Sequence, residues 1–261
     1  MKRVLRSIAI VSLFTALLIP ATAFAKGPTV IKTLPYTISV PGNYTLSKSL
    51  TYTANLVDAI TISASNVTLD MNGFGITGSG MATAAHDGIL ISGNGVEVRN
   101  GYLAGFFDGL STFGSIGTKA LNLKAYENKE FGICVGFDKV GYGGAVLDCK
   151  TYVNGDSGIA VCDIGSIIKG NVAYNNGANC GIYVNGQACI TGNNSYGNSG
   201  VGIYAGPGST VKNNSSCNNT MYGFYTTGTV LLDGNAATGN NGGGVGANYS
   251  VAGATLGTNT P

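Results

Sequence analysis

Asp87 and Asp108 are the acidic residues whose spacing best fits a shared chemical role. Each directly precedes a glycine, Gly88 or Gly109, and these two glycines belong to one recurring column. Two carboxylates held close together can bind calcium as oxygen ligands, or act as the acid and base of glycoside hydrolysis. The single histidine, His86, adjoins the first acid. The simpler interpretation is that each Asp-Gly pair makes a turn, because both residue types favour turns.

Three tyrosines, Tyr183, Tyr204 and Tyr225, each follow a Gly-Ile or Gly-Phe pair and are evenly spaced along the chain. They alternate with apolar residues, so the pleat of a strand would point them outward as an aromatic stack. Aromatic rings beside amide side chains suit sugars, and these three are the candidate carbohydrate-binding residues. An aromatic ladder that only stabilises a sheet is the alternative. Four further tyrosines support the same interpretation: Tyr126, Tyr152, Tyr174 and Tyr196.

The elements that position these residues are copies of one repeat unit. Glycines from Gly158 to Gly244 recur at intervals of 23, 21, 21 and 21, mostly at the start of Gly-Ile or Gly-Phe runs. Asparagines keep the same period, with intervals of 22, 21 and 21 from Asn171 to Asn235. A fixed period in several independent columns indicates a repeat architecture.

Each unit contains short apolar or β-branched runs separated by Gly and Asn, without the helical period of about 3.6. The chain is therefore predicted to be all-β: a single-stranded right-handed parallel β-helix of about ten coils, with a repeat period of 21–23. Asparagine tolerates left-handed bends between strands, and stacked amides can hydrogen-bond along a ladder. Equivalent residues on adjacent coils, such as Asp87 and Asp108, would lie about 5 Å apart.

Residues 1–25 have the features of a signal peptide. Lys2, Arg3 and Arg6 precede an apolar core at 8–19, and an Ala-x-Ala cleavage site ends at Ala25. Cleavage after Ala25 predicts a secreted or periplasmic protein. The apolar core is too short to favour a membrane span.

The rest of the chain is predicted to form one elongated domain. A capping segment is expected at 26–57, the β-helix at 58–247 and a C-terminal tail at 248–261. The longest departures from the repeat are the loops at 77–87 and 136–144, and loops on a rigid scaffold are common functional sites.

The charge of the exported chain argues against a nucleic-acid partner. Without the three basic residues of the signal peptide, 11 basic and 12 acidic residues remain, a net charge of −1. Such a chain has no basic surface for nucleic acid or anionic lipid. The six cysteines permit disulfides in an exported protein, with 15 possible pairings, but none share a column on adjacent coils. No cofactor is predicted, except calcium if the protein is a lyase.

The sequence between Ile60 and Leu110, with the runs ITISASNVTLDMNGFGITG and GILISGNGVEVRNGYLAGFFDGL, resembles the opening coils of pectate-lyase-like right-handed β-helix proteins. This group includes carbohydrate-binding and sugar-hydrolase β-helix domains and a periplasmic family linked to copper loading. The resemblance covers roughly residues 35–245, and it implies an extracytoplasmic protein that meets polysaccharide. The lyase branch implies Asp87 and Asp108 as calcium ligands and Arg99 as the base.

The chain departs from that group in its chemistry. It lacks the catalytic motif of paired acids on one strand, and its methionines after residue 25 are too dispersed for a copper site. The sequence therefore predicts an exported protein that binds or presents polysaccharide at the cell envelope, without assignable catalysis. The alternatives are a polysaccharide lyase or glycoside hydrolase that uses Asp87, Asp108 and Arg99, and a structural or adhesive rod. In the non-catalytic interpretations Arg99 forms an exposed ion pair with Asp70. The glycan and the oligomeric state stay open.

Overall fold

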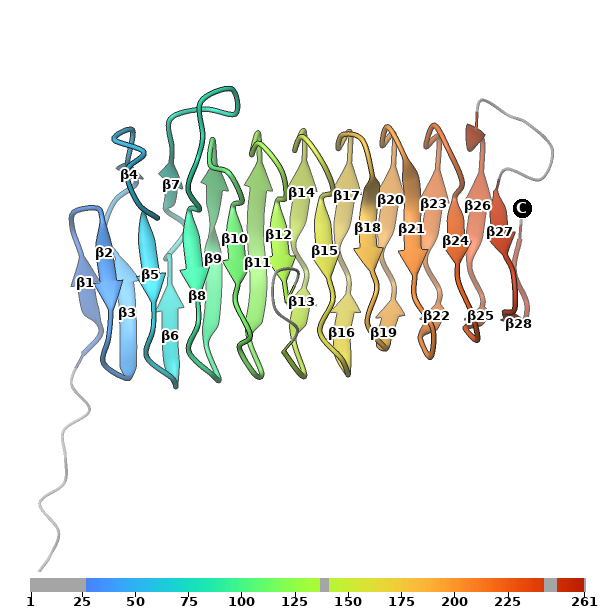
Figure 1. Ribbon diagram of the computed structural model, residues 1–261, viewed down its shortest axis with the longest axis horizontal. Helices are drawn as coiled ribbons and strands as arrows, with labels where there is room; N and C mark the ends of the chain where they lie inside the picture. The colour runs from blue at the N-terminus through green and yellow to red at the C-terminus, as the bar shows by residue number, and fades with distance from the viewer. Residues whose placement is uncertain (1–26, 137–140, 242–247, 261) are drawn as a thin grey trace, which may run out of the picture.

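The computed structural model describes residues 27–136, 141–241 and 248–260, and these residues form a right-handed parallel β-helix of about ten coils (Figure 1). The predicted fold class is thereby confirmed. The predicted signal peptide lies outside the described residues. Within the described ranges no helix is long and apolar enough to span a membrane.

One side of the coil, here called the first face, is a sheet of ten parallel strands, each contributed by one coil. Each strand pairs with its equivalents one coil before and one coil after, as β8 does with β5 and β10. The strands are β2 (Tyr36–Ile38), β5 (Ile60–Ile62), β8 (Ile89–Ile91), β10 (Leu110–Thr112), β12 (Ile133–Val135), β15 (Ile159–Val161), β18 (Cys180–Val184), β21 (Val201–Ala205), β24 (Phe224–Thr226) and β27 (Tyr249–Val251).

The other 18 strands form one bent sheet with two rows. The second face holds β1 (Thr29–Ile31), β3 (Gly42–Leu46), β6 (Val67–Asp70), β9 (Glu97–Ala104), β11 (Lys119–Tyr126), β13 (Ala145–Leu147), β16 (Ser166–Lys169), β19 (Ala188–Thr191), β22 (Thr210–Lys212), β25 (Leu231–Asp233) and β28 (Thr255–Leu256). The third face holds β4 (Leu50–Thr51), β7 (Gly75–Thr77), β14 (Lys150–Tyr152), β17 (Val172–Tyr174), β20 (Asn194–Tyr196), β23 (Ser215–Cys217) and β26 (Ala236–Thr238). The long strands β9 and β11 pass from the second face onto the third.

The column of glycines that marks the repeat is explained by a close approach between coils. A Cβ atom on Gly202 would lie 2.7 Å from the carbonyl oxygen of Gly223, and one on Gly181 would lie 2.9 Å from that of Gly202. The same contact, at 2.6 Å, relates Gly88 to Gly109. Real Cβ atoms do not approach an oxygen so closely, so these three positions leave no room for a larger residue.

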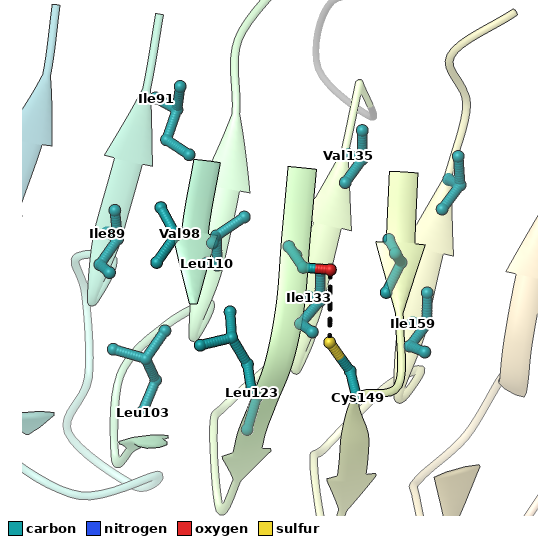
Figure 2. Packing of buried hydrophobic residues seen from close by; sticks show 14 of the residues in the cluster. Ile89, Ile91, Val98, Leu103, Leu110, Leu123, Ile133, Val135, Cys149 and Ile159 are labelled. Carbon is teal, nitrogen blue, oxygen red and sulfur yellow. Dashed lines mark hydrogen bonds between the residues drawn. The ribbon is translucent and has the colours of Figure 1, made fainter. Parts of the chain in front are cut away.

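Aliphatic side chains from the three faces fill the inside of the coil (Figure 2). Ile89, Leu110 and Ile133 are register partners on successive coils, and they belong to one fully buried cluster with Val98 and Leu123. Burying such a side chain contributes roughly 1.5–3 kcal/mol. One continuous core holds the three faces together, so the outward side chains between the core residues keep fixed positions.

Two ladders of asparagines, buried except at their last members Asn248 and Asn259, occupy the turns. One borders the second and third faces, and the other borders the third and first. Each amide nitrogen donates to the next amide oxygen at 2.8–3.0 Å, and most also donate to a backbone carbonyl. The predicted ladder is thus confirmed. The ladders contain Asn171, Asn193, Asn214, Asn235 and Asn259, and Asn128, Asn154, Asn176, Asn198, Asn219, Asn240 and Asn248.

The left-handed bends come directly before the ladder asparagines. Asn175 has φ 51° and precedes Asn176, and Asn213 has φ 54° and precedes Asn214. The expectation that the ladder residues themselves adopt the bend was therefore wrong. The bend makes the sharp corner, and the next residue is then directed inward, where its amide can reach the next coil.

Both terminal segments of the described chain belong to the coil. In the segment expected to be a cap, β1 pairs with β3 and β2 pairs with β5. In the segment expected to be a tail, β27 pairs with β24 and β28 with β25. The ring of Tyr249 stacks on Phe224 at 5.3 Å between centroids, which gives the last first-face strand an aromatic anchor.

Candidate functional site

Asp87 and Asp108 lie on adjacent coils, just before β8 and β10, at the edge of the first face. The backbone amide of Asp108 donates to Oδ1 of Asp87 at 3.2 Å, and that of Phe131 donates to Oδ1 of Asp108 at 2.9 Å. One coil earlier, the amide of Asp87 donates to Oδ1 of Asp58 at 3.0 Å. Asp108 is only 6% exposed. The two acids are neighbours, and each carboxylate accepts a backbone amide from the following coil.

The loop at 77–87 is fixed to its surroundings by side-chain hydrogen bonds. Asn55 donates to the carbonyl of Thr83 at 2.7 Å and accepts from the amide of Ala85 at 3.0 Å. Lys129 donates to the carbonyl of Ala84 at 3.3 Å. His86 lies at the end of this loop, with its Nδ1 3.9 Å from Oδ1 of Asp58. The other long loop, at 136–144, includes 137–140, which lie outside the described residues.

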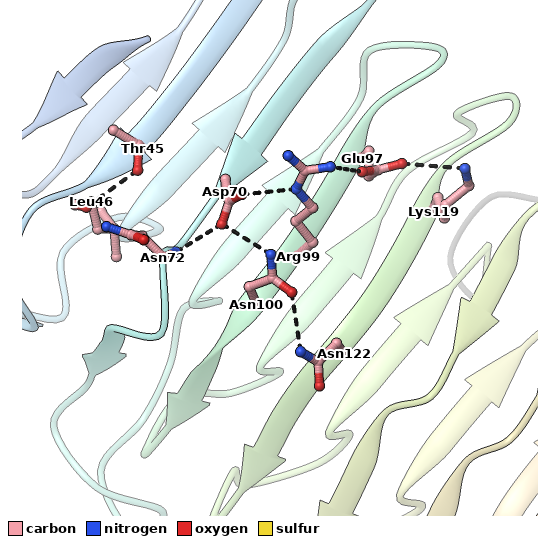
Figure 3. Close-up of polar contacts among 9 residues, drawn as sticks. All are labelled: Thr45, Leu46, Asp70, Asn72, Glu97, Arg99, Asn100, Lys119 and Asn122. Carbon is pink, nitrogen blue, oxygen red and sulfur yellow. Dashed lines mark hydrogen bonds and ion pairs between the residues drawn. The ribbon is translucent and has the colours of Figure 1, made fainter.

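Arg99 lies on the second face, in β9, whereas both acids lie at the edge of the first face. Its Nε donates to Oδ2 of Asp70 at 2.9 Å and its Nη1 to Oε1 of Glu97 at 3.0 Å (Figure 3). Glu97 also pairs with Lys119 at 3.2 Å. The guanidinium is thus held by the acids of its own face, and the predicted trio does not come together.

Asp70 is the most strongly held acid of this network. Burial would raise its pKa, but hydrogen bonds from the amide of Asn72 and from the side chains of Asn100 and Arg99 lower the pKa below its ordinary value. The carboxylate therefore stays ionised. In the part of the chain that the structure describes, no group of three or more His, Cys, Asp or Glu side chains could hold a metal ion.

Tyr183, Tyr204 and Tyr225 form an aromatic stack on β18, β21 and β24 of the first face. The ring centroids are 4.8 Å apart between Tyr183 and Tyr204, and 5.6 Å apart between Tyr204 and Tyr225. Their interplanar angles are 20° and 16°. All three are partly exposed, while the residues on either side of each point into the core. The predicted outward stack is therefore present.

A shallow hollow of about 290 Å³ lies over this stack. Tyr222, in the turn before β24, forms part of its wall. The Tyr222 ring is tilted by 37° to Tyr225, with 5.6 Å between the centroids. Met221, beside it, is 48% exposed. None of the residues that line the hollow is charged: Ala178, Asn179, Cys180, Tyr183, Val201, Tyr204, Met221, Tyr222 and Tyr225.

One tyrosine hydroxyl of the hollow already has a partner within the protein. The hydroxyl of Tyr204 lies 3.1 Å from that of Thr227, and either can donate. Burial, with smaller contributions from neighbouring groups, raises the pKa of Tyr183. Protonated hydroxyls both donate and accept hydrogen bonds, as sugar hydroxyls require.

A second aromatic stack, here called the third-face row, contains Tyr126, Tyr152, Tyr174 and Tyr196. Its centroid spacings are 4.8, 5.0 and 5.1 Å, and its interplanar angles are 5°, 13° and 7°. The ammonium group of Lys150 lies 5.9 Å from the ring centroid of Tyr152 and 5.1 Å from that of Tyr174. The chain thus presents aromatic rows on two faces.

Tyr222 and Lys150 are the residues that sequence reasoning missed. Tyr222 lies outside the repeating tyrosine column, and its place beside Tyr225 depends on the path of one turn. Lys150 directly precedes Thr151 and Tyr152 in a strand, so the alternation of a strand could have placed it on the same face as the ring. That signal was present in the sequence.

Comparison with solved structures gives matches to β-helix proteins of low sequence identity. The tailspike protein 2 enzymatically active domain of bacteriophage CBA120 is 15% identical, with a TM-score of 0.59, and the match covers 85% of this chain and 42% of that one. The Dettilon tailspike protein is 16% identical, with a TM-score of 0.52, over 88% of this chain and 60% of that one. The chain thus spans less than two thirds of either tailspike.

The A-module of a mannuronan C-5 epimerase from Azotobacter vinelandii is 12% identical, with a TM-score of 0.54, over 91% of this chain and 84% of the module. No protein-family model matches the sequence, and no curated protein matches it. At these identities the likeness establishes the shared β-helix fold and leaves the activity to be argued from the residues.

Proposed function

We propose that this protein binds polysaccharide along its first face, through Tyr183, Tyr204, Tyr225 and Tyr222. The observation that carries the proposal is the uncharged hollow of about 290 Å³ over the tyrosine stack. Sugar rings present apolar C–H surfaces together with hydroxyls, and a hollow of tyrosine edges, one tilted ring and amide groups can contact both. The solved tailspike and epimerase structures, whose names refer to enzymatic activity or to mannuronan, are consistent with a polysaccharide ligand.

The stack geometry defines how the sugar is contacted. The ring of Tyr204 lies between those of Tyr183 and Tyr225, so both of its faces are covered, and its hydroxyl pairs with that of Thr227. Tyr222 is tilted against the stack instead of continuing it. Tyr222 therefore supplies the ring surface against which a sugar packs, and the stack supplies hydrogen bonds at coil spacing.

The test is binding of purified protein to a panel of neutral and acidic polysaccharides, with polymer length followed in the same samples. Tyr222→Ala is expected to weaken binding of a neutral chain about fivefold, because one aromatic contact is lost. A buried tyrosine such as Tyr52 cannot serve as the control, because its replacement would disturb the core. The matched control is Tyr142→Ala, because Tyr142 is exposed (55%) and lies outside the hollow. Equal binding by wild type and Tyr222→Ala would contradict the proposal.

The same samples separate this proposal from the alternatives. A polymer that becomes shorter would make the protein a lyase or hydrolase, and Asp87→Asn and Asp108→Asn would then report whether those acids contribute. Calcium is included in half of the samples, because a lyase of the resembled type would need it. A protein that ignores every polymer would be a structural rod.

We propose in addition that the chain is exported, with a signal peptide cleaved after Ala25. N-terminal sequencing of protein recovered from the periplasm or medium of an expressing bacterium should begin at Lys26. Recovery of the uncleaved chain from the cytoplasm alone would contradict export.

A further inference from the structure

The third-face row differs from the first-face stack in its charge. Lys124 and Lys150 are register partners on adjacent strands, β11 and β14. Both are exposed, and neither forms an ion pair with any described residue. Like charges directly opposite each other on neighbouring strands are destabilising. An anion placed between the two ammonium groups would therefore relieve this repulsion.

Two acids lie near the row without neutralising the lysines. Glu127 follows Tyr126 at one edge of the face, and Asp148 precedes Cys149 and Lys150 at the other edge. Both are exposed, and neither is ion-paired with a lysine in the described chain. The lysine pair thus keeps its charge available to a ligand.

The tyrosines beside the lysines present ring edges and hydroxyls, which are the parts of the ring that suit an anionic ligand. Tyr152 and Tyr174 are each covered on both faces by neighbouring rings, so only their edges and hydroxyls reach solvent. The edge of an aromatic ring carries the positive part of its quadrupole. Burial is the main cause that raises the pKa of Tyr126 and Tyr152, so these hydroxyls stay protonated and can donate. Ring edges, hydroxyls and ammonium groups together make a surface rich in donors.

The face is also open along its length. Along the row, from β11 to β20, the second and third faces are either one continuous strand or joined by two-residue turns, such as 148–149 and 170–171. No long loop leaves the coil at this border in the described residues between Lys119 and Tyr196. An extended polymer can therefore lie along the row across several coils.

We propose that the third-face row, with Lys124 and Lys150, is a second binding surface that takes an acidic polysaccharide, whose carboxylate lies between the two ammonium groups. The tyrosine hydroxyls, repeated from coil to coil, bond to hydroxyl and ring oxygens of successive sugars. This surface is separate from the hollow on the first face and does not depend on it.

The experiment measures the dissociation constant of a galacturonate oligomer and of its methyl ester, which carries no charge, for wild type and three variants. Lys124→Gln with Lys150→Gln is expected to weaken binding of the acid about fivefold, as two exposed ion pairs are lost. The methyl ester should bind the wild type and this double variant alike. Raising the salt from about 0.1 M to about 1 M should erase the difference, because the Debye length falls from about 10 Å to about 3 Å.

Glu127→Gln provides a test of opposite sign. Removing this negative charge beside Tyr126 should tighten binding of the acid about twofold, an effect typical of one exposed charge. A purely structural role for the row would leave the dissociation constants of all these variants equal. Equal binding of the acid by wild type and the double lysine variant would overturn the proposal, as would equal affinity of the wild type for acid and ester.

Tyr222→Ala is the third variant and distinguishes the two faces. It should leave binding of the acid by the lysine pair unchanged, although it weakens binding of a neutral chain on the first face. If Tyr222→Ala abolishes binding of the acid and the lysine variant does not, the acid binds the first face. That result would overturn the second surface and support the first.

Discussion

The asparagine ladders inside the coil and the tyrosine rows outside it have the same spacing but very different surroundings. Asn193 is 2% exposed, and its amide donates to Asn214 and to the carbonyl of Ile168. Tyr174 is partly exposed, and its contacts are two neighbouring rings and one ammonium group. The inner column satisfies polar groups that have no access to water. The outer column adds packing to a sheet that is already hydrogen-bonded.

The two columns end at different places along the coil. The asparagine column continues to the end of the described coil, at Asn259. The tyrosine column stops after Tyr196, where Cys217 and Thr238 take the next two places without breaking the strand register. The coil therefore accepts other residues at the outer position. The four tyrosines are therefore compatible with the binding role proposed for the third-face row.

The largest expected difference between inside and outside concerns thiol reactivity. Burial raises the pKa of Cys149 and of Cys180 to about 12, from an ordinary 9.0. Such a rise in pKa lowers the thiolate fraction about a thousandfold, and the thiolate is the reactive form. Cys189 is exposed. Iodoacetamide at neutral pH should label Cys189 first, as mass spectrometry of peptides would show, and label Cys149 and Cys180 only after denaturation. Labelling of all three at similar rates would contradict the buried assignment.

Asn193→Ala should have the largest effect on stability. It removes the two hydrogen bonds that the Asn193 side chain donates. It also leaves the backbone carbonyl of Ile168 and the backbone amide of Asn171 without their side-chain partner. Each buried polar group left unsatisfied costs about 1–3 kcal/mol, so a loss of about 3 kcal/mol is expected. Urea unfolding measures it. The control, Asn194→Ala, changes the exposed neighbour and should cost less than about 0.5 kcal/mol.

The sequence repeat made the coil and its asparagine ladders predictable. The recurring glycines and asparagines revealed the coil, because a close backbone approach and a buried amide each favour one residue type at most turns. The first-face tyrosines were predictable for the related reason that the alternation of a strand assigns them outward. The outward direction of Lys150 follows from the same rule.

The hypothesis that Asp87, Asp108 and Arg99 form a catalytic trio misplaced Arg99, because spacing along one column gives no information across the coil. Asp87 and Asp108 share a column and do lie together. Arg99 follows Asp87 by roughly half a coil, so it emerges on another face. Its partner Asp70 is one coil away, as β6–β9 register requires. Tyr222 depends on a turn, and turns differ from coil to coil.

Gly202→Ala tests whether the glycine column is as demanding as the ladder. Its Cβ would clash with Oγ of Ser216 and lie 2.7 Å from the carbonyl oxygen of Gly223. Gly223 belongs to the next coil, and Oγ of Ser216 donates to the same carbonyl at 2.7 Å, so relief would break this hydrogen bond or separate the coils, and a loss of about 2 kcal/mol is expected in urea unfolding. Gly27→Ala is the control, since nothing lies within 4 Å of its added Cβ. A stable Gly202→Ala protein would mean that adjacent coils adjust easily.

Tyr174→Ala should cost less than either inner substitution. It removes the stacked ring contacts with Tyr152 and Tyr196, for a loss of about 1.5 kcal/mol. Tyr174→Phe keeps the stack and should change stability by less than about 0.5 kcal/mol. If Tyr174→Ala destabilised as much as Asn193→Ala in the same urea titrations, the row would be a structural requirement, and the argument for a ligand would weaken.

Asp70→Asn should have the smallest effect, because the Asp70 carboxylate is 30% exposed and its ion pair with Arg99 is worth no more than about 1 kcal/mol. The pKa of Asp70 is lower in the folded protein than in the unfolded chain. The stabilisation by the Asp70 carboxylate is therefore fully present above the pKa of the unfolded chain. It is lost as the pH falls through the pKa of the folded protein. Urea unfolding should show wild type more stable than the variant at pH 7, with the difference shrinking as the pH falls below the ordinary pKa of an aspartate. A difference that persists in acid would mean that hydrogen-bond geometry, and not charge, holds Asp70 in place, and the outer network would then resemble the inner ladders.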